Sequence, residues 1–454
     1  SGAASMKEAQ FDTNELFFSI TDKESKILSG NEVFVRISGY SKQELMGSLH
    51  NIIRHPDMPK VVFKILWDYL NADKPIVAYV KNRTKEGGYY WVLTAIFPQG
   101  ERYVSIRIKP NSPIFAIVRE LYFKLLIAES RGGMEESEPM LLNALEELGY
   151  LGYDQFMAKA LLLELSERKK ILDNIPVTDH NVELDSPLKI ALNALLEDSQ
   201  TLMRQYDHWF EKIDMFNHVK TMFEEKGVVL RHLARDIVFL SLNASVASYK
   251  VANGGETFGV LASDVRINAK ENDILIADVE TSVQQFSDLL NETIFSVSAI
   301  RLQIEMVTYF IREVLCQKSE VQLPELVDNI SSLMALVIEY SETSKRLQLE
   351  LDRQIQSALK YLDQLEQQMM YLGYIQVYGI IEAAGNQDES VRFGVIFSQL
   401  KTLVHETSQE IEIMQKSGHN FSVENRFLIK KSEGVDLLFR QLHEEILIIK
   451  ELED

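Results

Sequence analysis

The side chains that most often carry out catalysis do not occur here in any familiar spacing. His443 and Glu444 begin like the zinc-binding HExxH pattern, but position 447 is leucine, so the second histidine is missing. Gly254 to Gly259 has the glycine spacing of a phosphate-binding loop, but Val260 stands where the lysine must be. The sequence also lacks a GxSxG motif. We therefore expect no enzymatic activity and predict no catalytic or metal-binding residue.

The distribution of charge favours an anionic small ligand at one end of the chain. Residues 1–112 contain 15 Lys and Arg against 12 Asp and Glu, whereas the 454-residue chain contains 47 against 67 and has a net charge of −20. The acidic remainder should repel nucleic acid and anionic membrane surfaces. The single cysteine, Cys316, cannot form an internal disulfide, and we find no apolar run of the roughly 20 residues that a membrane span needs. These features predict a cytoplasmic protein that binds neither nucleic acid nor a membrane.

Short strand-like runs and turns dominate the N-terminal part. Runs rich in β-branched and aromatic residues begin near residues 16, 75, 89 and 102, and turn residues such as Gly87-Gly88 separate them. Between them, Ser41 is suited to cap the SKQELMG segment, and Pro59 opens the amphipathic segment PKVVFKILWDYL. The pattern predicts a small α+β domain with an antiparallel sheet over residues 11–112. Residues 1–10, which begin SGAAS, are expected to be a tag and an N-terminal cap.

Three motifs in this region closely resemble the PAS domain of bacterial aerotaxis receptors. They are NEVFVRISGYSKQELMG, HNIIRHPDMPKVVFKILWDYL and VKNRTKEGGYYWV. In that family the PAS domain binds FAD non-covalently and reads the redox state of the cell. The resemblance places Asn51, Arg54, His55 and Asp57 around the cofactor. Arg54 can pair with a pyrophosphate, while His55 and Asp57 can hydrogen-bond ring or ribose edges.

Two alternatives to a flavin stay open. Ile76 replaces a tryptophan that is usual in the third strand of the family, and an isoleucine cannot stack on a flavin ring. A haem could instead use His50 or His55 as its axial ligand. RHPDMP could also be a cap and turn in which Pro56 and Asp57 organise a helix start and His55 is satisfied locally, which would leave the domain without a cofactor.

The remainder of the chain has the composition of long helices. Nine of the ten prolines lie at or before Pro187, and no glycine occurs between Gly259 and Gly373. Alternating steps of four and three from Leu326 to Gly379 give sixteen positions, of which twelve are apolar. A spacing held for about eight heptads is typical of a coiled coil. Residues 113–185, with shorter helical patterns, are predicted to form a helical connector.

Breakers divide the helical part into four rods of about 60 residues, and therefore into two hairpins. The hairpins are predicted at residues 186–320 and 321–454. Their tips, residues 240–266 and 375–401, align without a gap at an offset of 135. If both tips lie at the same end, the two hairpins bury their apolar seams against each other. We therefore expect a long antiparallel four-helix coiled-coil bundle formed by two hairpins of one chain, for which a monomer is possible.

Both tips resemble the cytoplasmic hairpin tip of bacterial methyl-accepting chemotaxis receptors, whose pattern runs approximately LNAAxEAARAGExGxGFAVVAxEVRxLA. In that family the tip binds a histidine kinase and its coupling protein. The resemblance implies a partner-binding role for five residues, which are Asn243, Phe258, Arg266, Glu382 and Phe393.

Each tip keeps a different part of the family pattern. In the first tip Ala247 and Lys250 replace the family's glutamate and arginine, and in the second Tyr378 and Gly385 replace its asparagine and arginine. Glutamate pairs elsewhere, such as Glu224-Glu225, could be methyl-accepting sites or simply solvated charge.

Two functions remain. The first is a soluble cytoplasmic transducer whose PAS domain senses redox state or oxygen and alters the bundle. The second is a scaffold or adaptor with an empty PAS domain and a degenerate tip.

Overall fold

The computed structural model describes residues 7–176, 182–251, 255–317, 322–385 and 390–452. The chain forms two compact units: Ser1–Phe210 with Asn291–Ser344 and Glu433–Asp454, and Glu211–Leu290 with Lys345–Ser432. The tag-like SGAAS segment, Gly254 and part of the segment before Pro324 lie outside the described residues. The predicted domain bounds therefore stay predictions.

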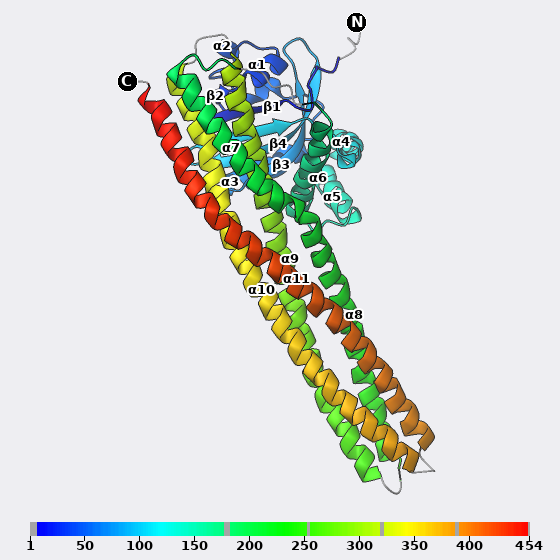
Figure 1. The fold of residues 1–454 in the computed structure, drawn as a ribbon. Coiled ribbons are helices and arrows are strands. Elements are labelled where there is room, and N and C mark those ends of the chain that lie inside the picture. The colour runs from blue at the N-terminus through cyan, green and yellow to red at the C-terminus, as the bar shows by residue number, and fades with distance from the viewer. Residues whose placement is uncertain (1–6, 177–181, 252–254, 318–321, 386–389, 453–454) are drawn as a thin grey trace. The chain divides into compact units, whose positions relative to one another are not determined.

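The first unit contains a five-stranded antiparallel sheet with the order β2-β1-β5-β4-β3 (Figure 1). β1 (Leu16–Asp22) pairs with β2 (Ile27–Gly30) and with β5 (Arg102–Ile108). β4 (Tyr89–Gln99) pairs with β5 and with β3 (Ile76–Arg83). The predicted antiparallel sheet is confirmed, and each of the four predicted runs is a strand. The four-residue strand β2 was not predicted.

Short helices connect β2 to β3. They are α1 (Glu32–Ser38), α2 (Lys42–Leu45), the 3₁₀ helix η1 (His50–Ile53) and α3 (Lys60–Asn71). Ser41 caps α2, as predicted, in a capping box with Glu44. Pro59 is the N-cap of α3 and provides no side-chain cap. Instead, the carboxylate of Glu129 accepts the backbone N–H groups of Lys60 and Val61 at 2.8 and 2.9 Å.

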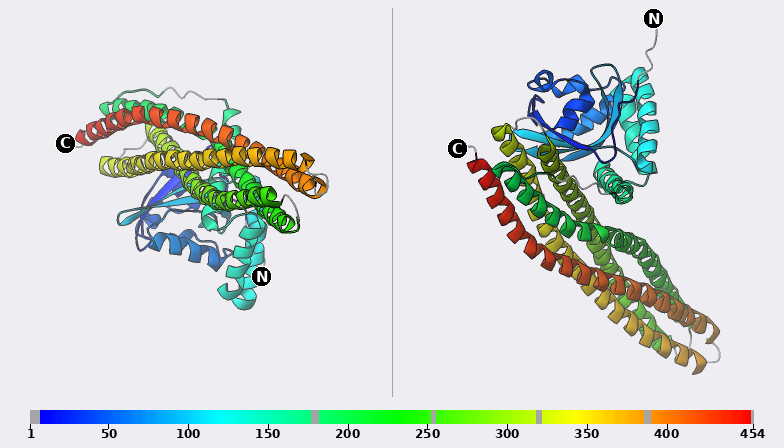
Figure 2. Two further views of the ribbon diagram at one scale, coloured as in Figure 1. Left: turned by 90° about the horizontal axis from the view of Figure 1, so that it is seen from below. Right: turned by 45° about the horizontal axis from the view of Figure 1, so that its top comes forward.

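The two faces of the sheet have different coverings (Figure 2). Successive side chains of a strand point to opposite faces. On one face, Phe18 of β1 contacts Phe310 with 5.1 Å between ring centroids, and Phe97 of β4 contacts Tyr340 at 5.2 Å. Both partner rings belong to long helices of the first unit. The opposite face, which carries alternate residues such as Thr21 and Arg107, is the face toward η1 and α3.

Three helices follow the sheet and form the predicted helical connector (Figure 1). They are α4 (Pro113–Gly132), α5 (Met134–Glu147) and α6 (Tyr153–Asp173). The buried carboxylate of Glu164 on α6 accepts hydrogen bonds from the hydroxyl of Tyr79 on β3 and from the backbone N–H of Ser112, just before α4. The connector is thus fastened to the sheet by side chains as well as by the chain itself.

Five long helices complete the described chain. They are α7 (Pro187–Glu211), α8 (Ile213–Tyr249), α9 (Gly255–Cys316), α10 (Leu323–Gly385) and α11 (Ser390–Glu451). The last three have 62, 63 and 62 residues, in agreement with the predicted rods. The first predicted rod is instead two helices, which are interrupted at Lys212 although neither glycine nor proline marks the break.

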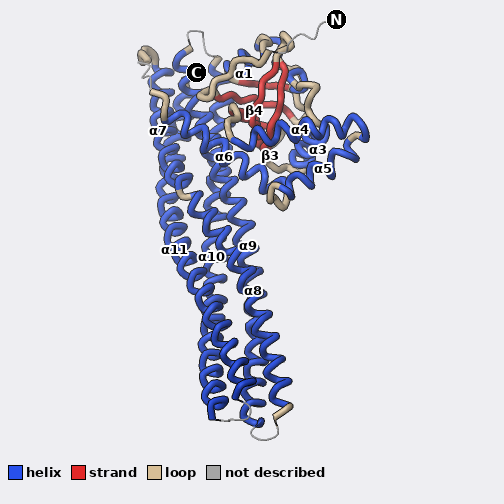
Figure 3. The backbone as a smooth tube through the Cα atoms, turned by 90° about the vertical axis from the view of Figure 1, so that its right-hand side faces the viewer, coloured by secondary structure: helices blue, strands red, loops and turns tan. Residues whose placement is uncertain are grey.

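In the second unit, α8, α9, α10 and α11 run side by side (Figure 3). Polar contacts join each helix to the next around the bundle: Arg231 with Glu280, Gln368 with Glu271, Arg426 with Asp352, and Lys226 with Glu410. These contacts pass from α8 to α9, to α10, to α11 and back to α8. The second unit is therefore a closed four-helix bundle made by one chain.

The two hairpin tips lie at the same end of this bundle, as predicted. The rings of Phe258 on α9 and Phe393 on α11 are stacked with 3.9 Å between centroids and 10° between planes. Both side chains are buried.

One helix in the described part of the chain is long and apolar enough to cross a membrane, judged by length and composition alone. It covers Glu256–Cys316, with a mean hydropathy of 1.4 in its most apolar window, and 78% of that window is buried inside the protein. Burial of this degree is that of a core helix of a bundle.

Candidate functional site

A cavity of about 320 Å³ lies between the sheet and the segment formed by η1 and α3. Alternate residues of neighbouring strands line it, as the period of two along a strand requires. From the sheet these are Thr21, Val80, Asn82, Thr94, Ile96, Tyr103, Ser105 and Arg107, and from the opposite wall they include His50, Asn51, Arg54, Phe63 and Trp67.

Arg107 is the most unusual residue of this cavity. Its side chain is only 3% exposed, yet no carboxylate in the described part of the chain forms an ion pair with it. Its Nη1 donates to Ser19 Oγ at 2.9 Å, and the guanidinium lies 5.5 Å from the ring of Phe17. Burial lowers the pKa of Arg107 to about 10. It is therefore still a cation at neutral pH, and a buried cation without an anionic partner is costly.

His50 lies beside Arg107 and is a neutral hydrogen-bond acceptor. Nη2 of Arg107 lies 2.6 Å from Nε2 of His50, and because a guanidinium can only donate, Nε2 must be the acceptor. Burial, with the nearby charge of Arg107 as the second cause, lowers the pKa of His50 to about 3. The ring of His50 also stacks on Phe34 of α1 at 6.3 Å. His50 therefore orients the guanidinium of Arg107 and leaves its positive charge unneutralised.

The mouth of the cavity combines a second arginine with aromatic rings. Arg54 is exposed, and its guanidinium lies 3.6 Å from the ring centroid of Phe63 on α3. Trp67 and Tyr103 contact each other edge to face at 6.2 Å, and both line the cavity. Such rings offer flat surfaces for stacking, and the arginine offers a bidentate donor for an anion.

The four predicted cofactor residues separate into two pairs. Asn51 and Arg54 line the cavity. His55 and Asp57 are not among its lining residues. The Nδ1 atom of the buried His55 accepts the backbone N–H of Asp57 at 3.0 Å, which is the local arrangement that the cap-and-turn interpretation expected. Burial lowers the pKa of His55. The ligand roles of all four remain predictions.

The polar walls also contain an unpaired hydroxyl. Thr94 Oγ1 is buried and has no hydrogen-bond partner among the described residues, and Thr94 lines the cavity at the position opposite Arg107 of β5. A ligand atom or a water is needed to satisfy it. Ile76, which replaces the family's tryptophan, is buried and does not line the cavity.

The predicted tip residues also fall into two groups. Asn243, Arg266 and Glu382 are exposed, whereas Phe258 and Phe393 are buried against each other. The two phenylalanines therefore pack the hairpin ends, and their rings are not available to a partner. A partner-binding role for the three polar residues stays a prediction.

Comparisons with known proteins agree with this fold. Residues 27–108 match the family model described as the PAS fold. The N-terminal part of the chain is a PAS domain. It is homologous to the aerotaxis receptor of Escherichia coli (strain K12), with 42% identity over 109 residues, which are 23% of this chain and 22% of that protein. The chain therefore spans about a fifth of the length of this relative.

Other matches also cover about a fifth of this chain. The nitrogen fixation regulatory protein of Klebsiella oxytoca is 29% identical over 87 residues, which are 18% of each chain. Among solved structures, the light state of the LOV domain of the blue-light photoreceptor Aureochrome1 has 22% identity and a TM-score of 0.20, covering 22% of this chain and 85% of that chain. The LOV domain of a blue-light activated histidine kinase from Erythrobacter litoralis has 15% identity and a TM-score of 0.20, covering 20% and 94%.

Sequence reasoning missed the buried cation of the cavity, Arg107, and the role of His50 as its neutral acceptor. Arg107 had one signal, since an arginine stands between two isoleucines, Ile106 and Ile108, near the end of a predicted strand. His50 was considered only as a haem ligand. That both would face the cavity depends on the register of β5 and on η1, which the sequence alone does not reveal.

Proposed function

We propose that this protein is a soluble cytoplasmic signal transducer without enzymatic activity, whose PAS domain binds a flavin, specifically FAD, and responds to redox state. The observation that supports this most is the buried, carboxylate-free Arg107 in the cavity of a PAS domain homologous to that of an aerotaxis receptor. A flavin supplies reversible electron acceptance when it is bound. In this proposal the helical part transmits the response to a partner at the bundle tips.

The cavity residues suit such a ligand. A volume of about 320 Å³ is at the small end of the range for ligand sites, so it suits the ring portion of a flavin, with the phosphates nearer the exposed Arg54. Trp67, Phe63 and Tyr103 provide the aromatic surfaces that the replacement of tryptophan by Ile76 seemed to remove. Arg107 and Thr94 would donate hydrogen bonds to the polar edge of the ring, and Asn82 could do the same.

Haem has less support at this site. An axial histidine must present a free ring nitrogen to the iron. Nε2 of His50 accepts a hydrogen bond from Arg107, and His55 lies outside the cavity lining. A haem ligated by His50 would therefore have to break the hydrogen bond between Arg107 and His50.

The proposed output is at the tips, where a histidine kinase of chemotaxis or its coupling protein would bind. The two tips and the residues just before them expose apolar side chains at equivalent positions of the repeat: Phe239 is 67% exposed and its counterpart Tyr374 is 64% exposed. The same holds for three further pairs, which are Leu242 with Val377, Val246 with Ile381, and Val260 with Val395. Exposed apolar groups in a cluster are typical of interaction surfaces.

The absorption spectrum of the purified protein tests the cofactor directly. We expect the two flavin bands in the near-ultraviolet and blue, with release of FAD on denaturation. Arg107→Met should weaken FAD binding about tenfold or more, because it removes a charge-assisted hydrogen bond. Arg102→Met, on the same strand but paired with Asp328 of α10, is the matched control and should leave affinity unchanged. A Soret band, or neither chromophore after reconstitution, would contradict the proposal; the second result favours the scaffold alternative.

Pull-down of the purified kinase coupling protein tests the output. Glu382→Ala and Phe239→Ser should each reduce its capture, because one removes an exposed charge and the other an exposed ring of the tip. Phe427→Ser, at an exposed ring of α11 outside the tip, is the control. Failure of the unaltered protein to bind would mean that another partner has replaced the kinase system.

A further inference from the structure

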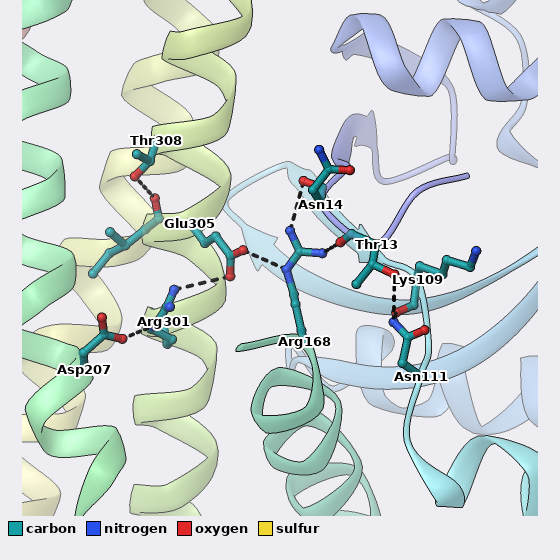
Figure 4. Close-up of polar contacts among 10 residues, drawn as sticks. Thr13, Asn14, Lys109, Asn111, Arg168, Asp207, Arg301, Glu305 and Thr308 are labelled. Carbon is teal, nitrogen blue, oxygen red and sulfur yellow. Dashed lines mark hydrogen bonds and ion pairs between the residues drawn. The ribbon is translucent and has the colours of Figure 1, made fainter. Parts of the chain in front are cut away.

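A row of alternating charges connects the start of β1 with α7 inside the first unit (Figure 4). Arg168 of α6 donates to the backbone carbonyls of Thr13 and Asn14, the latter at 3.2 Å, and to Glu305 Oε1 of α9 at 2.7 Å. The other oxygen of Glu305 lies 3.3 Å from Nη1 of Arg301. Arg301 Nε in turn donates to Asp207 of α7 at 2.6 Å. We call Arg168, Glu305, Arg301 and Asp207 the relay.

The relay has no net charge, and its burial decreases toward α7. The side chain of Arg168 is only 2% exposed and that of Glu305 is 14% exposed, whereas that of Asp207 is 24% exposed. Burial is the largest single cause and would raise the pKa of Glu305, but the charges of Arg168, Arg301 and Arg312 and the hydrogen bond from Arg168 together outweigh it, so the pKa is lowered and the group is a carboxylate. Removing or displacing one member of a buried network leaves the others uncompensated. The four groups should therefore rearrange together rather than one at a time.

One end of the relay contacts the turn that leads into a strand of the cavity wall. Arg168 holds the carbonyls of Thr13 and Asn14, and β1, which begins at Leu16, contains Ser19, which holds Arg107, and Thr21, which lines the cavity. Thr13 and Asn14 lie in a turn, in which the N–H of Glu15 donates to the carbonyl of Asp12 at 3.0 Å, and β1 begins two residues after Asn14. β1 pairs with a strand on each side, so we expect a shift of Ser19 to move the strand as a unit and to reach the carbonyls that Arg168 holds through this short turn.

The other end of the relay lies just before the break between two helices. Asp207 is four residues before Glu211, at which α7 ends, and α8 begins at Ile213. The chain passes from the first unit to the second between Phe210 and Glu211. A relay that ends here acts on the last turn of helix before the chain enters the bundle.

We propose that the relay is the regulatory link by which a change in the PAS cavity alters the C-terminal turn of α7. Displacement of β1 changes how Arg168 holds Glu305, Glu305 then changes its contact with Arg301, and the Arg301–Asp207 pair loosens or tightens the end of α7. The inference goes beyond the proposed function, since it holds for any ligand of the cavity.

Hydrogen exchange measured by mass spectrometry on the full chain tests the link without any ligand. Arg107→Met perturbs the cavity, and the readout is the exchange rate of the amides of residues 203–211. We expect the change to be about fivefold or more when the relay is intact, the low end of typical coupling between sites. In an Arg168→Met/Glu305→Met background, which keeps side-chain volume but removes both charges, we expect the same cavity variant to change exchange less than about twofold.

Arg102 and Asp328 supply the matched control. They form another ion pair between β5 and the helices of the first unit, at 2.9 Å, but outside the relay. Arg102→Met/Asp328→Leu should leave the response of residues 203–211 intact. If the relay double variant does not fold, Asp207→Asn serves in its place, because it weakens the partly exposed contact between Arg301 and Asp207 and should reduce the exchange response in the same way. If Arg107→Met does not fold, Ser19→Ala is used to perturb the cavity. An unchanged response without the relay, or no response with it, overturns the proposal.

Discussion

Three glutamates show how single side chains of the helical segments hold the PAS domain. Glu129 of α4 accepts hydrogen bonds from the first N–H groups of α3. Glu164 of α6 accepts the N–H of Ser112, just before α4. Glu313 of α9 accepts the N–H of Glu32, at the start of α1, at 3.0 Å. The first N–H groups of a helix have no partner within the helix, and a carboxylate there also complements the helix dipole. Each of these carboxylates therefore holds the N-terminal end of one helix in place, and each belongs to a helix outside the PAS domain.

Glu313 makes the first unit sensitive to pH. Burial, as the largest cause, raises the pKa of Glu313 to about 7 from 4.5, while hydrogen bonds from Glu32, Asn31 and Val33 lower it and the charge of Glu32 raises it. Because the folded pKa is above the unfolded one, the stabilisation is complete below about pH 4.5 and is lost as the pH rises through 7. The loss is at most about 3 kcal/mol.

Glu313→Gln should remove this titration. Relative to the variant, the unaltered protein should lose unfolding free energy between pH 5 and pH 8, as measured by urea denaturation at both values. Titration of other groups is common to both proteins and cancels in the difference. Equal pH slopes for the two proteins would show that Glu313 is ionised throughout.

We predict that Glu129 contributes more to the free energy of unfolding than an ordinary surface charge does. Glu129→Ala leaves the N–H groups of Lys60 and Val61, and the hydroxyl of Ser137, without their acceptor. We expect a loss of about 1–2 kcal/mol in unfolding free energy, as for removal of a helix cap. Glu120→Ala on the same helix, which breaks only an exposed pair with Lys124, is the control and should cost less than about 0.5 kcal/mol. If the two variants lose the same unfolding free energy, Glu129 does not act as a helix cap.

At the scale of elements, two glycines of α10 should respond in opposite ways to the same substitution. A Cβ on Gly379 would lie 2.4 Å from the ring of Phe397, which is fully buried on α11, whereas a Cβ on Gly373 would meet nothing within 4 Å. Gly379→Ala should therefore destabilise the second unit by about 1–3 kcal/mol through overpacking. Gly373→Ala should stabilise it by up to about 1 kcal/mol, because alanine is the better helix former.

Thermal denaturation followed by circular dichroism at the helix band measures both variants. If Gly379→Ala is as stable as Gly373→Ala, then Phe397 can move aside, and the close approach of α10 and α11 at this point does not depend on glycine.

Most of the elements could be predicted because their signals are local. Alternation marks β1, β3, β4 and β5, the Ser41 and Glu44 pair marks α2, and the heptads after Leu326 mark α10. β2 has only four residues, too few for a periodic signal. The interruption at Lys212 has no breaker, so it results from tertiary packing rather than from local propensity.

The candidate site was less accessible to sequence reasoning. Asn51 and Arg54 were found because a family motif contains them, and the same motif contributed His55 and Asp57, which lie outside the cavity lining. Arg107 and the relay residues Arg168 and Glu305 come from segments far apart in the sequence, and their pairing depends on how α6 and α9 pack. Charged residues on helices are usually solvated, so nothing in the pattern distinguishes a buried arginine from an exposed one.

At the scale of the whole molecule, the repeat explains why one chain can close a four-helix bundle. Two hairpins with the same apolar seam bury it against each other, and the stacked Phe258 and Phe393 show that the equivalent tips come together. The polar contacts of α8 to α9, α9 to α10, α10 to α11 and α11 to α8 leave no side of the ring for another chain to complete. A bundle built in this way needs no partner subunit for stability.

We therefore expect a stable monomer of 52.1 kDa. Sedimentation equilibrium should give this mass over a wide range of protein concentrations, and the melting temperature should not change with concentration, because dissociation does not accompany unfolding. The exposed apolar residues of the tips can produce weak association at high concentration, which Phe239→Ser should reduce. A tight dimer whose melting temperature rises with concentration would mean that hairpins of two chains pair with each other, as the subunits of a dimeric receptor do, and the single-chain bundle would then be wrong.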